Sequence, residues 1–446
     1  MNKRWMGAIL GCAVVATSFA EDWPQFCVPN RNNISTETGL ADSWPEGGPK
    51  VLWEKTVSDG YSSPAIKDGK VYFADRDGNK SVLLCMDLNS GTNLWKCAIE
   101  DPGTMSHQQY AGTRGTPTVT DDAVYLVTAW GTMLCVDLES KSVRWKHNLL
   151  EEYGMSLHMW GMSQSPLIYK DLVIVVPSAE SAGVVAYNRK DGAVVWKSKS
   201  IGGYSFASPA LYTICGKEMI LAVGSQAGGG FGGGGGGRGR GRPGAAPQAA
   251  STTASSGVFG LSPEDGSVLW SYTGWQCGNA IPFPITISDD RVFMTGGYNA
   301  GSAMFRVEKT DEGYKTTELF KNSIIGPQLH QPIYFDDRIL VVNTDNSLND
   351  GLACFKLDGT MVWRTKDIAG GPTFERGGFI IADGKIILLD AKTGKLHLAK
   401  ADVSGYHELA SAPMVKKNDM AWAPLTLSNG KLIVRDWTTM KCVDLK

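Results

Sequence analysis

The histidine and carboxylate side chains of this sequence, which could act as acids, bases or ligands, do not form a known catalytic motif. Its six histidines are scattered, and the adjacent carboxylates at residues 121–122, 289–290 and 336–337 all fall at one position of a repeated pattern, where a hairpin turn accounts for them. The sequence contains no G-x-S-x-G nucleophile elbow, no phosphate-binding loop and no dinucleotide fingerprint. No catalytic role can therefore be assigned from motifs.

A different set of residues is better suited to binding. Aromatic, cationic and amide side chains occur shortly before successive repeated units, at Tyr61, His107, Arg114, Trp160, Tyr204, Asn279, His330, Arg376 and Trp422. If the units form a ring, these segments converge at one mouth of a central channel. Such a group could hold a sugar, a quinone or a peptide. A solvated rim without a ligand is the alternative.

The repeat that would position these residues has a defined motif. It reads small residue, x, Asp, three residues, Gly, three residues, Trp, and its first full copy contains Cys85, Asp87, Gly91 and Trp95. Later and degenerate copies contain Asp137, Trp145, Gly192, Trp196, Gly266, Trp270, Gly359, Trp363, Asp390, Gly394 and Asp444. We expect structural roles for all of them: Asp bonds turn N–H groups, Gly takes the left-handed conformation, and Trp is buried between units.

The spacing of the motif predicts the fold. Successive tryptophans lie 42, 50 and 51 residues apart at Trp53, Trp95, Trp145 and Trp196. A period of about 45 residues suits four short strands with their turns, which is the size of a propeller blade. We therefore predict an all-β fold, an eight-bladed β-propeller with four-stranded antiparallel blades. One unit lacks its tryptophan, and Leu319–Phe320 should replace it.

The two ends of the chain predict how the ring closes. The last copy of the motif stops just after Asp444, whereas residues 46–53 read like its missing turn and outer strand. In the other blades these pieces belong to one hairpin. Residues 51–57 should therefore pair with the blade built from residues 424–445, so that an N-terminal strand closes the ring and no sheet edge stays open.

The N-terminus looks like a targeting segment. Two basic residues, a short apolar run and Ser18-Phe19-Ala20 predict a signal peptide over residues 1–20. A lipoprotein signal at Cys12 is the less favoured alternative. We therefore expect an exported protein, in the periplasm or on the cell surface, without a transmembrane segment.

The rest of the chain would form a strap and one domain. We assign residues 21–42 to an N-terminal strap and residues 43–446 to a single propeller. Residues 227–256, rich in glycine and arginine, predict a disordered loop inside one blade. An inert loop is favoured over one that touches RNA or another polyanion.

The repeat resembles the pyrroloquinoline-quinone (PQQ)-type propeller repeat over nearly the whole mature chain. The opening Asp22-Trp23-Pro24-Gln25-Phe26 and the following Pro29-Asn30-Arg31-Asn32 are similar to exported bacterial propellers of this group, although Cys27-Val28 replace their usual Arg-Gly. The resemblance implies either a BamB-like scaffold or a quinone-dependent alcohol dehydrogenase. Those enzymes carry two adjacent cysteines against the quinone, and this sequence has none and no C-x-x-C-H haem motif.

We therefore favour a ligand- or protein-binding scaffold in the cell envelope. A PQQ-dependent oxidoreductase is the first alternative and a carbohydrate-active propeller the second. We expect no metal site and no cofactor, with PQQ as the less favoured outcome. The partner would be an envelope protein or a small ligand at the channel mouth. A net charge of −2 does not favour nucleic acid, and we expect a monomer.

The cysteines are better explained by packing than by redox chemistry. Cys85, Cys135, Cys354 and Cys442 occupy one repeat position, which suits small buried apolar residues. Cysteines at equivalent positions of different blades should be too far apart to bridge. The best disulfide candidate is Cys27 with Cys97, because the N-terminal strap must cross some blade edge.

Overall fold

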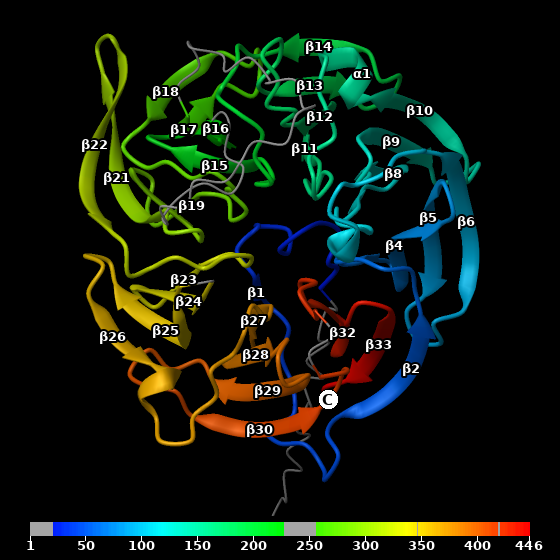
Figure 1. Ribbon diagram of the computed structural model, residues 1–446, viewed down its shortest axis with the longest axis vertical. Helices are drawn as coiled ribbons and strands as arrows, with labels where there is room; N and C mark the ends of the chain where they lie inside the picture. Colours follow the sequence, from blue (N-terminus) through cyan, green and yellow to red (C-terminus); the bar gives the residue numbers. More distant parts are fainter. Residues whose placement is uncertain (1–20, 227–255, 346, 418–419) are drawn as a thin grey trace, which may run out of the picture.

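The computed structural model describes residues 21–226, 256–345, 347–417 and 420–446. The signal peptide expected over residues 1–20, Cys12 and nearly all of the loop expected over 227–256 therefore lie outside the described residues. The described residues form eight sheets arranged as blades around a central axis (Figure 1). This confirms the eight-bladed propeller. In these ranges, helix is limited to α1 (Leu149–Tyr153) and two 3-10 turns, Gln108–Tyr110 and Thr365–Asp367.

The first four blades each use four consecutive strands, numbered from the channel outwards. Blade 1 contains β3 (Ala65–Lys67), β4 (Lys70–Asp77), β5 (Lys80–Asp87) and β6 (Asn93–Glu100). Blade 2 contains β7 (Thr118–Val119), β8 (Ala123–Val127), β9 (Thr132–Asp137) and β10 (Val143–Asn148). Blade 3 contains β11 (Leu167–Tyr169), β12 (Leu172–Val175), β13 (Val185–Asn188) and β14 (Val194–Lys197). Blade 4 contains β15 (Ala210–Ile214), β16 (Lys217–Gly224), β17 (Gly257–Leu261) and β18 (Val268–Tyr272).

The remaining blades follow the same plan, with two additions from the N-terminal segment. Blade 5 contains β19 (Ile285–Thr286), β20 (Arg291–Gly296), β21 (Gly301–Thr310) and β22 (Gly313–Asn322). Blade 6 contains β23 (Ile333–Phe335), β24 (Arg338–Thr344), β25 (Asn349–Lys356) and β26 (Met361–Arg364). Blade 7 contains β27 (Phe379–Ala382), β28 (Lys385–Leu389), β29 (Lys395–Lys400) and β30 (Glu408–Pro413), joined by β1 (Ile34–Ser35). Blade 8 contains β31 (Thr426–Ser428), β32 (Lys431–Arg435), β33 (Thr439–Asp444) and β2 (Lys50–Thr56).

The ring closes as the sequence predicts. Strand β2 pairs antiparallel with β33, with Trp53 opposite Cys442. The same register sets Trp95 opposite Cys85 in blade 1. The N-terminal strand therefore supplies the missing outer strand of the last blade and covers an edge that would otherwise be open.

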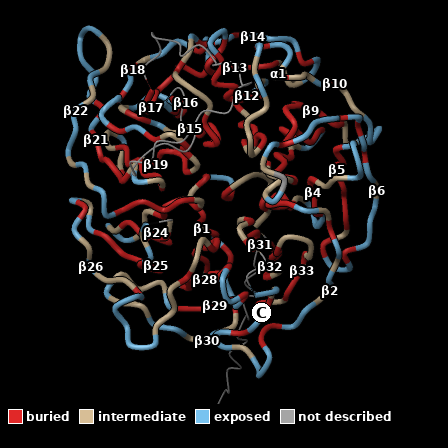
Figure 2. Tube along the Cα trace, in the orientation of Figure 1, coloured by how far each residue is buried: buried red, intermediate tan, exposed pale blue. Residues whose placement is uncertain are grey.

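The core lies between the blades. One apolar cluster, for example, joins Tyr72 and Leu83 of blade 1 to Val124 and Leu134 of blade 2. Figure 2 shows buried residues along the inner strands and exposed residues along the outer ones. Each blade is thus stabilised mainly by its two neighbours, because a single four-stranded sheet cannot bury both of its apolar faces alone.

At several joints of the ring the motif tryptophan connects one blade to the next. In four joints its indole Nε1 donates to a carbonyl of the following blade: Trp53 to Leu88 (2.8 Å), Trp145 to Arg189 (2.9 Å), Trp196 to Pro263 (3.1 Å) and Trp363 to Val403 (2.9 Å). At three of these joints the side of the ring covers the motif glycine of the next blade, at Gly91, Gly192 and Gly266. A Cβ on Gly266 would lie 2.3 Å from the Trp196 ring, and one on Gly91 would lie 2.7 Å from Trp53. The fourth differs from the sequence-based expectation, because Gly394 precedes β29 and lies beside Val415 and Lys416.

Substitutions in the motif keep this contact or weaken it. In blade 5 Phe320 takes the place of the tryptophan and covers Gly359, which confirms the expected replacement. In blade 2 Lys141 stands where glycine is usual and has a φ of 58°. The facing Trp95 of blade 1 is only half-buried, in contrast to Trp53 and Trp145.

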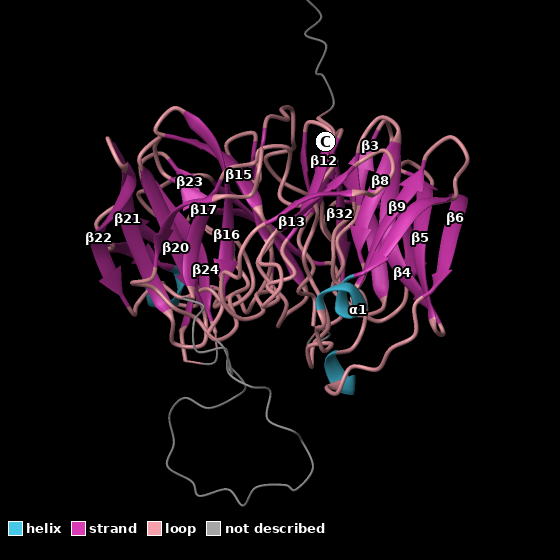
Figure 3. Cartoon of the chain, turned by 90° about the horizontal axis from the view of Figure 1, so that it is seen from above, coloured by secondary structure: helices cyan, strands magenta, loops and turns pink. Residues whose placement is uncertain are grey.

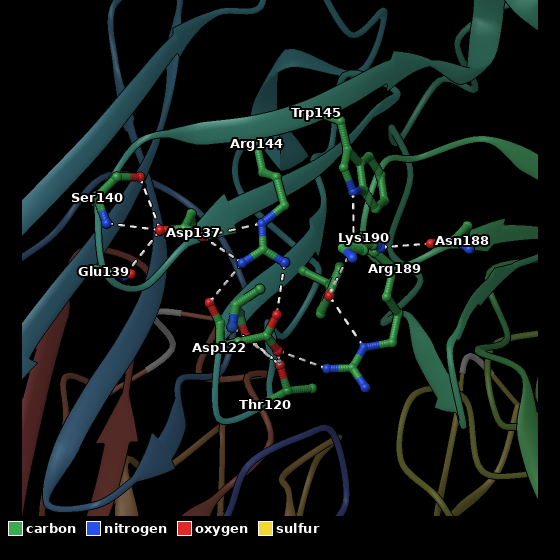
Figure 4. Close-up of polar contacts among 12 residues, drawn as sticks. Thr120, Asp122, Asp137, Glu139, Ser140, Arg144, Trp145, Asn188, Arg189 and Lys190 are labelled. Carbon is green, nitrogen blue, oxygen red and sulfur yellow. Dashed lines mark hydrogen bonds and ion pairs between the residues drawn. The ribbon is translucent and has the colours of Figure 1, made fainter.

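The motif aspartates organise the turns beside these tryptophans (Figure 4). Asp137 accepts hydrogen bonds from the N–H groups of Glu139 and Ser140 and pairs with Arg144 at 2.5 Å. The Ser140 N–H and the Arg144 guanidinium hold the pKa of Asp137 well below its usual range. Arg144 also pairs with Asp122 at 2.7 Å. Asp122 in turn pairs with Arg189 of blade 3, so this turn is tied to the next blade.

The cysteines have a packing role, and one expectation about them is wrong. All eight cysteines of the described ranges are free thiols, so Cys27 and Cys97 form no disulfide. Cys27 packs against blades 4 and 5, whereas Cys97 packs between blades 1 and 2. The strap runs through the channel and does not cross the outer edge of blade 1. Burial raises the pKa of the Cys85 thiol to about 11.

The first prediction tests the tryptophan contact. Trp53→Ala should lower the free energy of unfolding by about 3–5 kcal/mol, because it removes a buried ring from the joint between blades 8 and 1. Val51→Ala on the same strand is the control, since Val51 is 44% exposed. Urea unfolding of both variants measures the difference. Equal losses of unfolding free energy in the two variants would show that the Trp53 indole does not stabilise the contact between blades 8 and 1.

The second prediction separates packing from backbone strain at a motif glycine. Gly266 and Gly216 both have a φ of +71°, but a Cβ would strike the Trp196 ring only at Gly266. Each alanine substitution should cost about 1–3 kcal/mol for the left-handed conformation. Gly266→Ala should cost at least about 1–2 kcal/mol more, because the ring must move. Similar midpoints of thermal unfolding for the two variants would contradict this.

Candidate functional site

A pocket of about 260 Å³ lies on the propeller axis. Its walls come from the connections between blades, which precede the innermost strands. Those connections include α1 and lie on one face of the ring, whereas the C-terminus lies on the other (Figure 3). The structure brings six of the nine sequence candidates together in this pocket: Tyr61, Arg114, Trp160, His330, Arg376 and Trp422.

The other three candidates do not line the pocket. His107 lies behind its wall, with its ring edge-on to Trp160 at 6.1 Å between centroids. Tyr204 stacks on His158 at 5.3 Å. Asn279 is buried. His107 and Tyr204 therefore pack behind the lining residues Trp160 and Phe206.

Several lining residues were not predicted from the sequence. Phe26 reaches the pocket from the strap, and Tyr298 reaches it from the turn between β20 and β21. Neither lies in a segment before an innermost strand, and the sequence predicted lining residues only in such segments. Gln328 does lie in such a segment, two residues before His330, and side-chain alternation along that segment could have identified it.

The pocket has an aromatic wall. Trp422 stacks on Tyr61 with 5.2 Å between ring centroids and 13° between ring planes. Tyr110 lies nearly parallel to Trp422 at 6.1 Å, and Trp160 lies nearly parallel to Tyr298 at 6.4 Å. Phe26 forms part of the floor, where its ring packs edge-on against Phe283. These rings give the pocket flat apolar surfaces.

Arg114 brings an uncompensated positive charge into this wall. Its Nη2 donates to the carbonyl of Tyr110, and its guanidinium lies over the Tyr61 ring at 4.8 Å. Its Nε is buried without a hydrogen-bond partner. Within the described ranges no carboxylate pairs with Arg114, and burial lowers its pKa to about 10. A buried cation without a carboxylate is costly, so this site favours an anion.

Arg376 supplies a second cation that is already partly neutralised. Its Nε donates to Gln328 Oε1 at 2.5 Å, and its Nη1 pairs with Glu375 at 3.1 Å. Its guanidinium also lies 5.8 Å from the Trp422 ring centroid. Arg376 therefore adds positive potential, while its carboxylate partner leaves Arg114 as the stronger site for an anion.

His330 is held as a neutral side chain beside Arg376. Its Nε2 lies 2.9 Å from the carbonyl oxygen of Arg376, which can only accept, so Nε2 carries the proton. Burial lowers the pKa of His330 to about 4. Burial, together with Arg114 and His107, lowers the pKa of His158 to about 4 as well. Neither imidazole therefore adds charge to the pocket at neutral pH.

The strap forms the floor. Trp23 exchanges two backbone hydrogen bonds of 2.8 Å with Ile66 of β3, and Ile34 pairs in parallel with Ile381 of β27. Between these points Arg31 donates to the carbonyls of Pro209 (2.6 Å) and Pro166 (2.8 Å). The strap thus crosses the channel and divides it into two cavities.

Two further features concern the part of the chain that the structure describes. It contains no group of three or more His, Cys, Asp and Glu side chains that could hold a metal ion. It also contains no helix long and apolar enough to cross a membrane.

The third prediction concerns His330 and pH. Its folded pKa of about 4 lies below the value of 6.5 expected when unfolded, so the unfolded state binds more protons between these values and stability falls as pH falls through this window. Between pH 7 and pH 5 the loss should be about 2 kcal/mol. Urea unfolding at both pH values should show a correspondingly smaller loss for His330→Gln. Parallel losses in the two proteins would contradict the assignment.

Comparison with known proteins places the chain in a family. A family model described as outer membrane protein assembly factor BamB matches residues 79–347. No curated protein matches the chain. Among solved structures, BamB from Moraxella catarrhalis is 15% identical with a TM-score of 0.53, and the match covers 88% of this chain and 98% of that one.

Two enzymes share the fold as well. Quinohemoprotein alcohol dehydrogenase from Comamonas testosteroni is 11% identical with a TM-score of 0.62, and the match covers 94% of this chain and 80% of that one. A europium-containing methanol dehydrogenase is 9% identical with a TM-score of 0.61, with 93% and 89% covered. Likeness at these identities shows the fold alone. The family match spans more than half of the sequence, and the chain therefore belongs to the PQQ-like propeller family described as outer membrane protein assembly factor BamB.

Proposed function

We propose that this chain is a binding propeller of the cell envelope and that its axial pocket takes a small organic anion. The observation that carries the proposal is Arg114, a guanidinium without a carboxylate partner in the described ranges, set in an aromatic pocket. An anionic group of a ligand would supply the missing partner. The flat rings of Trp160 and Trp422 would cover the apolar body of the same molecule.

The envelope setting rests on the family and on the N-terminal sequence. Residues 1–20 would be removed as a signal peptide, residues 21–42 would serve as the strap, and residues 43–446 would form the single propeller. The family description, an outer membrane assembly factor, supports a protein partner in addition to the ligand. Residues 227–256 would remain a surface loop.

Quinone-dependent alcohol oxidation is the second candidate function. Two alcohol-oxidising enzymes share the fold, and the cations of the pocket suit the carboxylates of PQQ. The sequence, however, has no adjacent cysteines to stack on the quinone. A neutral sugar is less well matched, because it would leave Arg114 uncompensated.

The fourth prediction tests the anion site. Titration with PQQ and with a series of aromatic and aliphatic carboxylates should quench tryptophan fluorescence saturably, since Trp160 and Trp422 line the pocket. Arg114→Ala should weaken binding at least tenfold, about 1.4 kcal/mol or more. Arg306→Ala is the control, because Arg306 lies on the surface of blade 5 and is 44% exposed. Matching neutral amides should not bind.

A second measurement distinguishes the two functions. With PQQ, calcium and a primary alcohol we expect no reduction of an artificial electron-accepting dye. Quinone-dependent dye reduction that Arg114→Ala abolishes would establish the enzyme and overturn the binding-only proposal. Equal binding of carboxylates and amides would overturn the anion site itself.

A further inference from the structure

The strap leaves a second cavity on its other side. This cavity of about 520 Å³ is lined by Gln25 and residues 29–32 of the strap and by the inner strands of blades 3 to 6. Ser208 and His330, just before β15 and β23, face the axial pocket. Thr213 and Tyr334, within the same two strands, face the second cavity. The two cavities therefore open toward opposite mouths of the channel.

The strap shows that the channel accepts an extended chain. It pairs with blade 1 through Trp23, which exchanges two backbone hydrogen bonds with Ile66. It accepts a hydrogen bond from Val119 of blade 2 at Pro24 and pairs in parallel with β27 of blade 7. Backbone addition to an innermost strand is thus already used on three blades.

The innermost strands of blades 3 to 6 have no such partner. Apart from the pairing inside their own blades, β11, β15, β19 and β23 form no backbone ladder with another described segment. These four strands line the second cavity. An unpaired strand edge offers a row of N–H and C=O groups to an incoming strand. The apolar side chains of Ile168, Leu211 and Ile285 lie beside these edges and could cover alternate side chains of such a strand.

The base of the cavity is electropositive. Arg31 is only 3% exposed, its Nε has no hydrogen-bond partner, and no carboxylate of the described residues pairs with it. The hydroxyl of Tyr212, which also lines the cavity, is likewise buried without a partner. The turns at the outer rim carry acidic pairs at residues 289–290 and 336–337. An incoming carboxylate is therefore favoured at the inner end of the cavity and not at its rim.

We propose that this second cavity binds the C-terminal segment of a partner protein as an added strand. The segment would pair with the open inner edge of one of the four innermost strands β11, β15, β19 and β23, with its terminal carboxylate directed toward Arg31. This site is separate from the axial pocket and its anion, so each can exist without the other.

The experiment uses synthetic hexapeptides of alternating apolar and polar residues, each made with a free C-terminal carboxylate and with a C-terminal amide. When the library is screened for binding to the full chain, we expect to recover peptides whose carboxylate form binds at least tenfold more tightly than the amide form. N-methylation of alternate peptide amides in one register should weaken binding tenfold, and in the other register should not, because only one row of amides faces the strand edge.

Two variants locate the site. Thr213→Trp should weaken peptide binding at least tenfold by filling the cavity from an exposed position, so folding should be preserved. Val195→Trp, on the outer strand β14 and 50% exposed, is the matched control and should bind normally. Both variants should still bind carboxylates at the axial pocket with unchanged affinity. This affinity is measured from the change in tryptophan fluorescence relative to the same variant without ligand. No enriched peptide, equal binding of acid and amide forms, or unaltered binding by Thr213→Trp would each overturn the proposal.

Discussion

The ring depends on side-chain contacts between neighbouring blades, and at three joints an outer-strand tryptophan of one blade packs against a turn glycine of the next. The tryptophan stays paired within its own sheet while its side chain reaches the next blade, and the glycine lacks a Cβ, so the ring can approach its backbone. The indole N–H then finds a carbonyl of the neighbouring turn, as Trp53 does at Leu88. The same contact thus recurs at several joints between blades, and β2 supplies the tryptophan at the joint between blades 8 and 1.

Circular closure also explains why the middle of the molecule is suited to binding. Eight blades held at their outer strands leave a channel whose walls are inner strands and connections. The strap crosses this channel and anchors itself through Arg31, a buried cation satisfied mainly by proline carbonyls. Its passage separates an aromatic pocket around Arg114 from a cavity bounded by open strand edges. Both cavities contain a guanidinium without a carboxylate partner among the described residues, so both are better suited to anions than to neutral molecules.

The sequence predicted the repeating parts of this structure more successfully than the single ones. The motif recurs in most blades, so its turns, its tryptophan positions and the replacement by Phe320 could be recognised from spacing. The channel mouth was only partly predictable: Arg114 and Trp422 precede innermost strands and reach the pocket, whereas Tyr204 precedes one and stacks behind the wall on His158. The position of a residue before an innermost strand determines the end of the channel at which it lies. It does not determine the direction in which its side chain points.

The sequence by itself determined the blade number, the pairing that closes the ring and the packing role of the motif cysteines, because each follows from local periodicity repeated many times. Only the tertiary structure decided the path of the strap, since residues 21–42 have no repeat to compare with. That path brings Phe26 into the pocket, carries Cys27 away from Cys97, and leaves the inner edges of four blades uncovered. These contacts join residues far apart in the chain, and their geometry depends on how eight sheets pack around one axis.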